Sequence, residues 1–263
     1  MSLTPREPPQ TEEQPTQAPP KLINARRTRP WVVRFPATFG LIAFTMLVFM
    51  AQYFSQQISG IDLVLDWGAK IRPAIAAGEV WRLITPIFVH VGLWHFFVNM
   101  YSLYVLGPAV ESFFGSARML AFYLISGVGG VGLSLLLSAN PSAGASGAIF
   151  GLLGALVAFF FGHRKVFGRR GMAQFRHLLV VALLNLFLGL MPGIDNWGHM
   201  GGMISGVLVA FYLGPKMELE WPEPDRPRLV DQRSWRDTRQ WIIVAAAAIL
   251  VLAMMASFST LGL

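Results

Sequence analysis

The chain has 263 residues, a formal net charge of +7 and no cysteine, and only 13% of its residues are charged. Without cysteine it has no disulfide framework, no thiolate metal site and no cysteine nucleophile. Several apolar stretches approach the roughly 20 residues that span a bilayer core, which excludes an ordinary soluble domain and predicts several membrane spans. In such a protein the placement of basic residues matters more than the net charge, so we expect no nucleic-acid partner.

Residues 1–34 form a polar N-terminal tail. They are rich in proline, glutamine, threonine and glutamate and have little apolar surface to bury, so we expect a disordered cytoplasmic tail. The first apolar stretch begins near Pro36, after several arginines, whereas a cleavable signal needs a short apolar core near the start. We therefore expect the first helix, over residues 37–54, to be retained.

Seven apolar stretches predict seven transmembrane helices. Six form a core over residues 35–214, a cytoplasmic linker follows over residues 215–239, and the seventh lies within residues 240–263. The expected spans cover residues 37–54, 93–106, 119–137, 147–161, 178–191, 199–213 and 241–258. The sequence thus predicts an all-α polytopic membrane protein in a six-plus-one arrangement.

The basic residues indicate how these helices are oriented. With a cytoplasmic N-terminus, 18 lysines and arginines fall on the inner side, and three, Lys70, Arg72 and Arg82, fall on the outer side. Because cytoplasmic loops carry an excess of lysine and arginine, this distribution predicts a cytoplasmic N-terminus and a C-terminus on the opposite side. We expect the protein in a bacterial cytoplasmic (inner) membrane.

A loop of small residues leads into the fourth helix and ends at Ser146. Ser146 lies 18 residues before Arg164, and His199 in the sixth helix lies 17 residues before Lys216. At about 1.5 Å per residue, both lie about 26 Å from the inner boundary, just beneath the outer surface. A serine and a histidine at one depth are a candidate nucleophile and base, although a membrane serine can also bond to its own helix backbone.

Glycines next to both residues predict that the two helices approach closely. Each helix carries a GxxxG motif, which lets two backbones come into contact. The four glycines are Gly147, Gly151, Gly202 and Gly206. Because His199, Gly202 and Gly206 share one helix face, we expect the imidazole to reach the hydroxyl. The motif is also consistent with helix packing alone.

Two motifs around these residues resemble the rhomboid family of intramembrane serine proteases. The signature of that family is GxSG in one helix and HxxGxxxG in another. In this chain they read Gly144-Ala-Ser146-Gly147 and His199 through Gly206. The resemblance implies that Ser146 and His199 form a catalytic dyad.

Two further motifs extend the resemblance to the second helix. A Trp-Arg pair precedes an HxxxN formed by His95 and Asn99, and residues 107–115 are similar to the family's turn after that helix. The resemblance covers roughly residues 33–213. It implies a rhomboid-like six-helix core and an endopeptidase without cofactor that cleaves transmembrane proteins near the external face of the bilayer.

The second helix also offers donors for acyl transfer, which develops an oxyanion. His95 and Asn99 are i, i+4 neighbours on one face, and the Ser146 N–H at a helix start supplies a third donor. The competing interpretation is a metal site. His90 and His95 do not share a face, however, and HExxH is absent. We therefore expect no metal.

An aromatic residue is implied beneath the imidazole, four positions after the serine. In this chain it is Phe150, where the family often has tyrosine, so we expect stacking without a hydroxyl hydrogen bond. We expect no acidic residue within the membrane to orient His199. Elsewhere, Glu111 is expected to cap the following helix or to pair with Arg118.

Trp81 and Arg82 belong to the long loop before the second helix. They are expected either to anchor that loop at the membrane interface or to build its structure beside the active site. Transmembrane substrates and membrane lipids are the expected partners, and the sequence gives no oligomeric state.

Two other functional classes are alternatives to the protease. A catalytically silent rhomboid-like protein that binds or escorts helices would usually lack the serine or the histidine, and both are present. A transporter is disfavoured because the sequence lacks inverted-repeat symmetry and paired acidic residues inside the spans.

Overall fold

The computed structural model describes residues 30–223 and 226–259. The chain divides into two compact units, Met1–Arg34 and Phe35–Leu263. In the first unit the described part is the single-turn helix α1 (Trp31–Arg34), in which the Val33 and Arg34 N–H groups donate to the Pro30 carbonyl. The tail expected to be disordered lies mostly outside the described residues.

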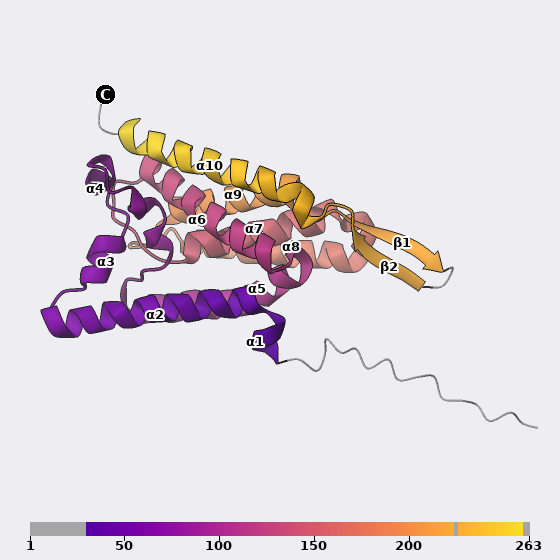
Figure 1. Ribbon diagram of the computed structural model, residues 1–263, viewed down its shortest axis with the longest axis horizontal. Coiled ribbons are helices and arrows are strands. Elements are labelled where there is room, and N and C mark those ends of the chain that lie inside the picture. Colours follow the sequence, from indigo (N-terminus) through magenta and orange to yellow (C-terminus); the bar gives the residue numbers. More distant parts are fainter. Residues whose placement is uncertain (1–29, 224–225, 260–263) are drawn as a thin grey trace, which may run out of the picture. The chain divides into compact units, whose positions relative to one another are not determined.

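The second unit is built mainly from long helices (Figure 1). They are α2 (Pro36–Ser59), α5 (Gly92–Phe114), α6 (Ser116–Leu137), α7 (Ser146–Gly162), α8 (Arg164–Leu188), α9 (Asn196–Leu213) and α10 (Trp235–Ser259). Short helices fold the loop between α2 and α5, namely α3 (Leu63–Gly68), α4 (Arg72–Ala76), η1 (Val80–Leu83) and η2 (Thr85–Ile87). Each of the seven expected spans coincides with one long helix, while the number of membrane crossings stays a prediction.

The centre of this unit is the pair α7 and α9, which make the most extensive helix contact. A Cβ atom built on Gly202 would lie 1.9 Å from the Gly147 carbonyl oxygen, and one on Gly206 would lie 2.0 Å from the Gly151 oxygen. Only hydrogen fits at such distances, so the two backbones touch directly. The four glycines predicted to pack helices therefore all lie at this contact.

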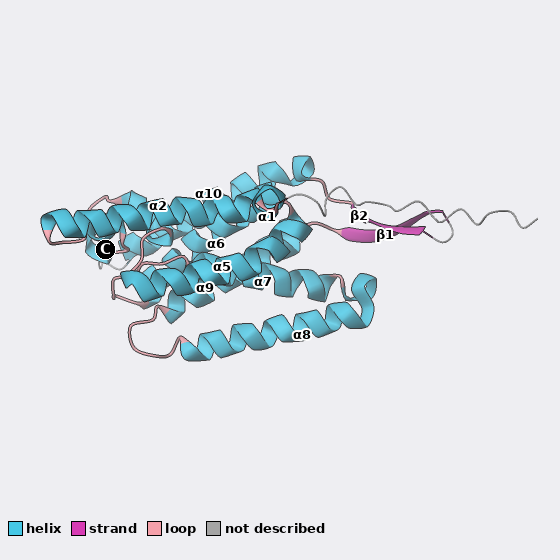
Figure 2. Cartoon of the chain, turned by 90° about the horizontal axis from the view of Figure 1, so that it is seen from below, coloured by secondary structure: helices cyan, strands magenta, loops and turns pink. Residues whose placement is uncertain are grey.

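The other helices surround the central pair. α6 packs against α7 and α9, and α10 packs mainly against α6. α8 packs mainly against α7 and lies along the lower edge of Figure 2. It kinks at Gly168, and its buried residues are only Gly171, Leu178 and Ala182. α8 also begins at Arg164, well before the predicted span at residue 178, because its first half is rich in basic residues and apolar composition does not identify it.

Polar side chains join α2 to α5. The buried Glu111 carboxylate of α5 accepts hydrogen bonds from the Ala37 and Thr38 N–H groups at 2.9 Å and from the Thr38 hydroxyl at 2.8 Å. It also accepts from the Ser116 hydroxyl at 2.6 Å. Glu111 thus satisfies the orphan N–H groups at the start of α2. Neither predicted role of Glu111 is found: it caps α2 and not the following helix α6, and Arg118 pairs with Asp231.

A β-hairpin occupies the predicted linker. β1 (Met217–Glu223) pairs antiparallel with β2 (Arg226–Asp231), and Leu219 faces Leu229 in the register. Arg118 of α6 donates to Asp231 at 2.7 Å, and the Met217 N–H donates to His163 Nε2 at 2.9 Å. These bonds tie the base of the hairpin to the helices.

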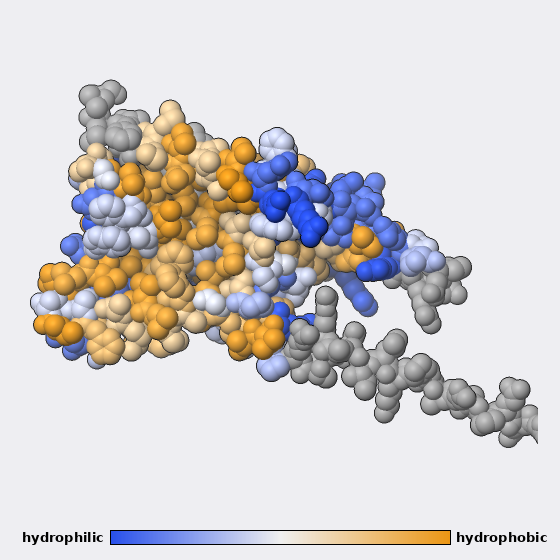
Figure 3. Space-filling view, in the orientation of Figure 1, coloured by the Kyte–Doolittle hydropathy of each residue, from blue (hydrophilic) through white to orange (hydrophobic). Residues whose placement is uncertain are grey.

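The helix surfaces are suited to lipid. Among the described residues, three helices are long and apolar enough to cross a membrane, α2, α6 and α8, and α7 is a shorter apolar helix. Figure 3 shows apolar residues over the helices, with hydrophilic ones gathered toward the end that carries the hairpin. α9 falls outside this group because Asn196, His199 and its glycines lower its hydropathy.

Candidate active site

Ser146 is the first residue of α7 and follows a loop whose backbone is held on both sides. The Gly144 N–H donates to the Pro86 carbonyl at 2.8 Å, and the Ala145 N–H donates to His90 Nε2 at 3.3 Å. Gly144 has φ +130°, a conformation that residues with a Cβ rarely adopt. The small residues before Ser146 therefore allow a tight turn that presents the hydroxyl at a helix start.

His199 lies in the first turn of α9 and meets this serine. Its Nε2 is 2.9 Å from Ser146 Oγ, within hydrogen-bond distance. The direct backbone contact at Gly202 and Gly206 brings the two helices close enough for this bond. The structure thus brings together the two residues predicted from their equal depth and their glycine motifs.

The Phe150 ring stacks on one face of the His199 imidazole. Its ring lies 4.4 Å from the His199 ring, centroid to centroid, with 14° between the planes. Phe150 is one turn after Ser146 on α7, so one helix supplies both the hydroxyl and the stacking surface. Among the described residues, no hydrogen-bond partner is found for the buried Nδ1 of His199.

His95 and Asn99 of α5 converge on Gly144, two residues before the serine. A Cβ on Gly144 would lie 2.8 Å from His95 Nε2 and 3.6 Å from Asn99 Nδ2. Asn99 is buried, and its Nδ2 donates to the His95 carbonyl at 3.0 Å. The absence of a side chain at Gly144 therefore leaves room for two donors beside the Ser146 loop.

His90 is a supporting residue that the sequence did not reveal. Besides accepting from Ala145, its ring lies 5.3 Å from that of His95. Its backbone is clamped by Gln52 of α2, whose Oε1 accepts from the His90 N–H and whose Nε2 donates to the His90 carbonyl, both at 2.9 Å. In the sequence, only the position of His90 in the loop that leads to His95 pointed to this supporting role.

Among the described residues, no group of three His, Cys, Asp or Glu side chains is arranged to hold a metal.

Arg82 organises the loop between α2 and α5. Its Nη1 donates to the Asp66 and Ala69 carbonyls at 2.6 and 2.8 Å, and its Nε pairs with Glu79 at 2.6 Å. Trp81 stacks on Trp67 with the rings 5.3 Å apart. Of the two expectations for Trp81 and Arg82, these contacts favour a role in loop structure.

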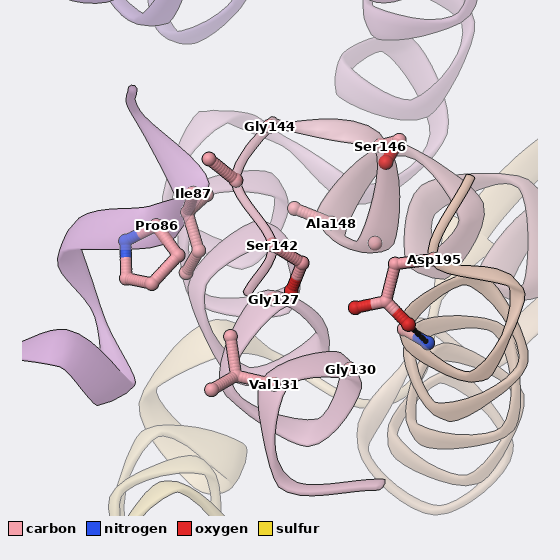
Figure 4. Close-up of a pocket in the computed structure, with 13 residues that line it drawn as sticks. Pro86, Ile87, Gly127, Gly130, Val131, Ser142, Gly144, Ser146, Ala148 and Asp195 are labelled. Carbon is pink, nitrogen blue, oxygen red and sulfur yellow. Dashed lines mark hydrogen bonds between the residues drawn. The ribbon is translucent and has the colours of Figure 1, made fainter. Parts of the chain in front are cut away.

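Asp195 is a second residue near the site that no sequence motif indicated. It lies one turn before His199, and its Oδ1 accepts the Gly198 N–H at 3.0 Å as the N-cap of α9. Asp195 and Ser146 line the same cavity of about 30 Å³ (Figure 4). An aspartate four residues before a candidate histidine was the available signal.

Comparison with known proteins identifies the family. Residues 77–216, more than half of the chain, match the model of the rhomboid domain. The chain is 40% identical over 178 residues to Rhomboid protease GluP of Bacillus subtilis, covering 67% of this chain and 34% of that protein. It is 34% identical over 192 residues to the mitochondrial RHOMBOID-like protein 6 of Arabidopsis thaliana, covering 72% and 61%. The chain spans less than two thirds of either relative's own length. It is an integral membrane protein that belongs to the rhomboid family.

Proposed function

We propose that the chain is an intramembrane serine endopeptidase with Ser146 as nucleophile and His199 as general base. The observation that carries the proposal is the 2.9 Å contact between Ser146 Oγ and His199 Nε2. For the hydroxyl to donate there, Nε2 must be unprotonated and Nδ1 must carry the ring hydrogen. As Ser146 attacks the scissile carbonyl, Nε2 takes its proton and then passes it to the leaving amine.

Three donors are proposed for the oxyanion: His95, Asn99 and the Ser146 N–H. The two side chains lie against Gly144, and the Ser146 N–H at the start of α7 is outside the helical ladder. Donors of this kind act when charge develops in the transition state, and they lower the barrier most in a site that excludes bulk water. Water for hydrolysis of the acyl-enzyme fits the cavity of about 30 Å³ beside Ser146.

The proposed substrates are transmembrane proteins cut near the external face of the bilayer. The apolar surface of the helices supports access from lipid, and the depth predicted for Ser146 supports the position of the cut. The proposed location is a bacterial cytoplasmic membrane, with the N-terminus cytoplasmic and the C-terminus outside. The distribution of lysine and arginine and the relative from Bacillus subtilis support this proposal.

The orientation is tested by cysteine labelling, because the chain has no cysteine of its own. Asn140→Cys and Ser234→Cys both introduce exposed thiols, one before α7 and one after β2. In intact cells a membrane-impermeant maleimide is expected to label only Asn140→Cys. Labelling of only Ser234→Cys would reverse the orientation.

The catalytic proposal is tested with the full chain in proteoliposomes that contain a single-span model substrate. We expect cleavage by the wild type and only the same background rate with Ser146→Ala, His199→Ala and the double variant, because the two residues act as one unit. Ser102→Ala is the matched control, since Ser102 is a half-buried serine of α5 whose hydroxyl donates to the Val98 carbonyl. Cleavage above that background by Ser146→Ala contradicts the dyad. Binding of the substrate without cleavage by the wild type favours a catalytically silent helix-binding protein.

A further inference from the structure

A charged cluster beside the candidate site joins three segments of the chain. Lys70, between α3 and α4, has a fully buried side chain whose Nζ donates to Ser134 Oγ of α6 at 2.5 Å. The Ser134 hydroxyl in turn donates to Asp195 Oδ2 at 2.5 Å. Lys70 Nζ lies 3.9 Å from the same carboxylate oxygen. The ammonium has only donors and the serine has one hydrogen, so the bonds run from Lys70 through Ser134 to Asp195.

The carboxylate end of this cluster belongs to the helix of His199. Asp195 caps α9 through Gly198, so its position fixes the first helical turn. Figure 4 shows Asp195 and Ser142 pointing toward one another in the cavity that Ser146 also lines. A negative charge one turn before His199 acts on the imidazolium that forms when the base takes a proton.

The lysine end belongs to the loop of Ser146. The Lys70 N–H donates to the Ser142 carbonyl at 2.8 Å, and the Ser142 N–H donates back to the Lys70 carbonyl at 3.2 Å. Ser142 lies four residues before Ser146. The main chain of Lys70 therefore contacts the loop that carries Ser146. Its side chain, through Ser134, contacts the helix that carries His199.

The lysine of the cluster is fully buried, and its carboxylate is half-buried. Burial lowers the pKa of Lys70, against the attraction of Asp195. Burial by itself raises the pKa of Asp195, but hydrogen bonds from Ser134 and Ser142 together with the charge of Lys70 hold it below its ordinary value. A buried ion pair adds little net stability over an apolar pair of the same size, so stability alone does not account for this cluster.

We propose that Lys70 is a positioning residue for the dyad, which holds the first turn of α9 against the Ser146 loop and balances the negative charge facing His199. This inference rests on the proposed function, because it takes His199 as the base. The other titratable or charged groups facing the cluster are His95 of α5, beside His199, and Arg72, beside Lys70. Arg72 is bonded to the Leu135 and Ser138 carbonyls at the end of α6.

The test is the pH dependence of kcat/KM for the full chain in proteoliposomes. His199 must be neutral to accept a proton, so activity is lost on the acid side. Lys70→Met leaves the carboxylate unbalanced, and the acid limb is expected to move to higher pH by about half a unit or more. Asp195→Asn keeps an N-cap acceptor but removes the negative charge, so its acid limb is expected to move to lower pH. The double variant is expected to return close to the wild type.

Lys216→Met is the matched control, because it removes a lysine from an exposed pair with Glu218 that lies outside the cluster. Its acid limb is expected to stay close to that of the wild type. If Lys70→Met fails to fold, Asp195→Asn measures the same charge from the other side. Unchanged acid limbs in the Lys70 and Asp195 variants, or shifts in the same direction, overturn the inference.

Labelling of Ser146 by a fluorophosphonate separates this test from the proposed function. The labelling rate reports activation of the hydroxyl without any cleaved substrate, and its acid limb is expected to shift in the same directions. A chain that labels at Ser146 but cleaves no transmembrane substrate contradicts the endopeptidase proposal, while its labelling profile still decides the role of Lys70.

Discussion

The contact between α7 and α9 and the contact between α2 and α5 hold the candidate site by different physical means. The first is backbone against backbone, with a Cβ on Gly202 falling 1.9 Å from a carbonyl oxygen. The second depends on polar side chains, chiefly Glu111, which accepts four hydrogen bonds from α2 and α6. The first contact therefore fixes the distance between Ser146 and His199 and tolerates no added volume. The second fixes the helix of His95 and Asn99, and its stability depends on the acceptor oxygens of Glu111.

Adding one methyl group at the first contact is the strongest way to break it. In Gly206→Ala the new Cβ would lie 2.0 Å from the Gly151 carbonyl oxygen, and backbone atoms have to move apart. We expect loss of detectable proteolysis and destabilisation of about 1–3 kcal/mol from overpacking. The measurements are cleavage in proteoliposomes and unfolding in mixed micelles.

The matched control for Gly206→Ala is Gly162→Ala at the end of α7. Apart from the adjacent backbone of its own helix, no described atom lies within 4 Å of a Cβ built on Gly162. Alanine is a better helix former than glycine, so this variant is expected to keep full activity and to be at least as stable as the wild type. Full activity in Gly206→Ala would show that the backbone contact does not set the dyad distance.

A substitution at Asn99 tests whether α5, which the second contact holds in place, supplies an oxyanion donor. Losing one oxyanion donor costs about 10² to 10³ in kcat, or roughly 2.7–4 kcal/mol. We expect Asn99→Ala to show this loss with KM for a transmembrane substrate little changed, because the donor meets charge mainly as it develops. The measurement is steady-state cleavage over a range of substrate densities in the bilayer.

Asn185→Ala is the control for Asn99→Ala, because Asn185 of α8 makes the same bond to the carbonyl four residues earlier but is exposed. It is expected to leave kcat unchanged. If Asn99→Ala instead unfolds in detergent or keeps full kcat, Asn99 is a packing residue and not an oxyanion donor.

The first contact was predictable from the sequence and much of the second was not. Glycine spacing and equal depth indicated that Ser146 and His199 meet, because both signals lie within single helices. The Glu111 bonds join residues more than 70 positions apart, so no local pattern indicated them. Lys70 and Ser134 are likewise 64 positions apart, and counting Lys70 as an outer charge gave no sign that it is buried.

The hairpin shows a local signal that was overlooked. Apolar residues alternate with glutamates from Met217 to Trp221, a period of two that is typical of a strand. The charges in this segment favoured a linker instead. In α8 the helix is longer than predicted, because apolar composition does not identify the basic segment that begins at Arg164 and is also helical.

Removing the carboxylate of Glu111 tests whether the second contact supports stability more than chemistry. Glu111→Gln keeps the size of the side chain but replaces one acceptor oxygen with a donor facing the N–H groups of α2. We expect destabilisation of about 1.5–3 kcal/mol, the range for hydrogen bonds to a charged group, with kcat of the folded protein nearly unchanged. The measurement is unfolding in mixed micelles combined with initial cleavage rates.

Ser116→Ala is the milder comparison, because it removes one of the four donors to Glu111. It is expected to destabilise less than Glu111→Gln. A large fall in kcat at unchanged stability in Glu111→Gln would place this carboxylate in the chemistry and remove the contrast between the two contacts.

The smallest expected effect belongs to the stacking of Phe150 on His199 within the first contact. Aromatic pairs contribute about 0.5–1.5 kcal/mol beyond buried area, so Phe150→Leu is expected to lower kcat about 2- to 10-fold while the Ser146–His199 bond persists. Phe160→Leu is the matched control, since Phe160 is buried on the same helix but packs against Phe113 and Phe167. It is expected to reduce stability without this fall in kcat. Equal kcat losses in both variants would mean that Phe150 acts through packing of α7 and not through the imidazole.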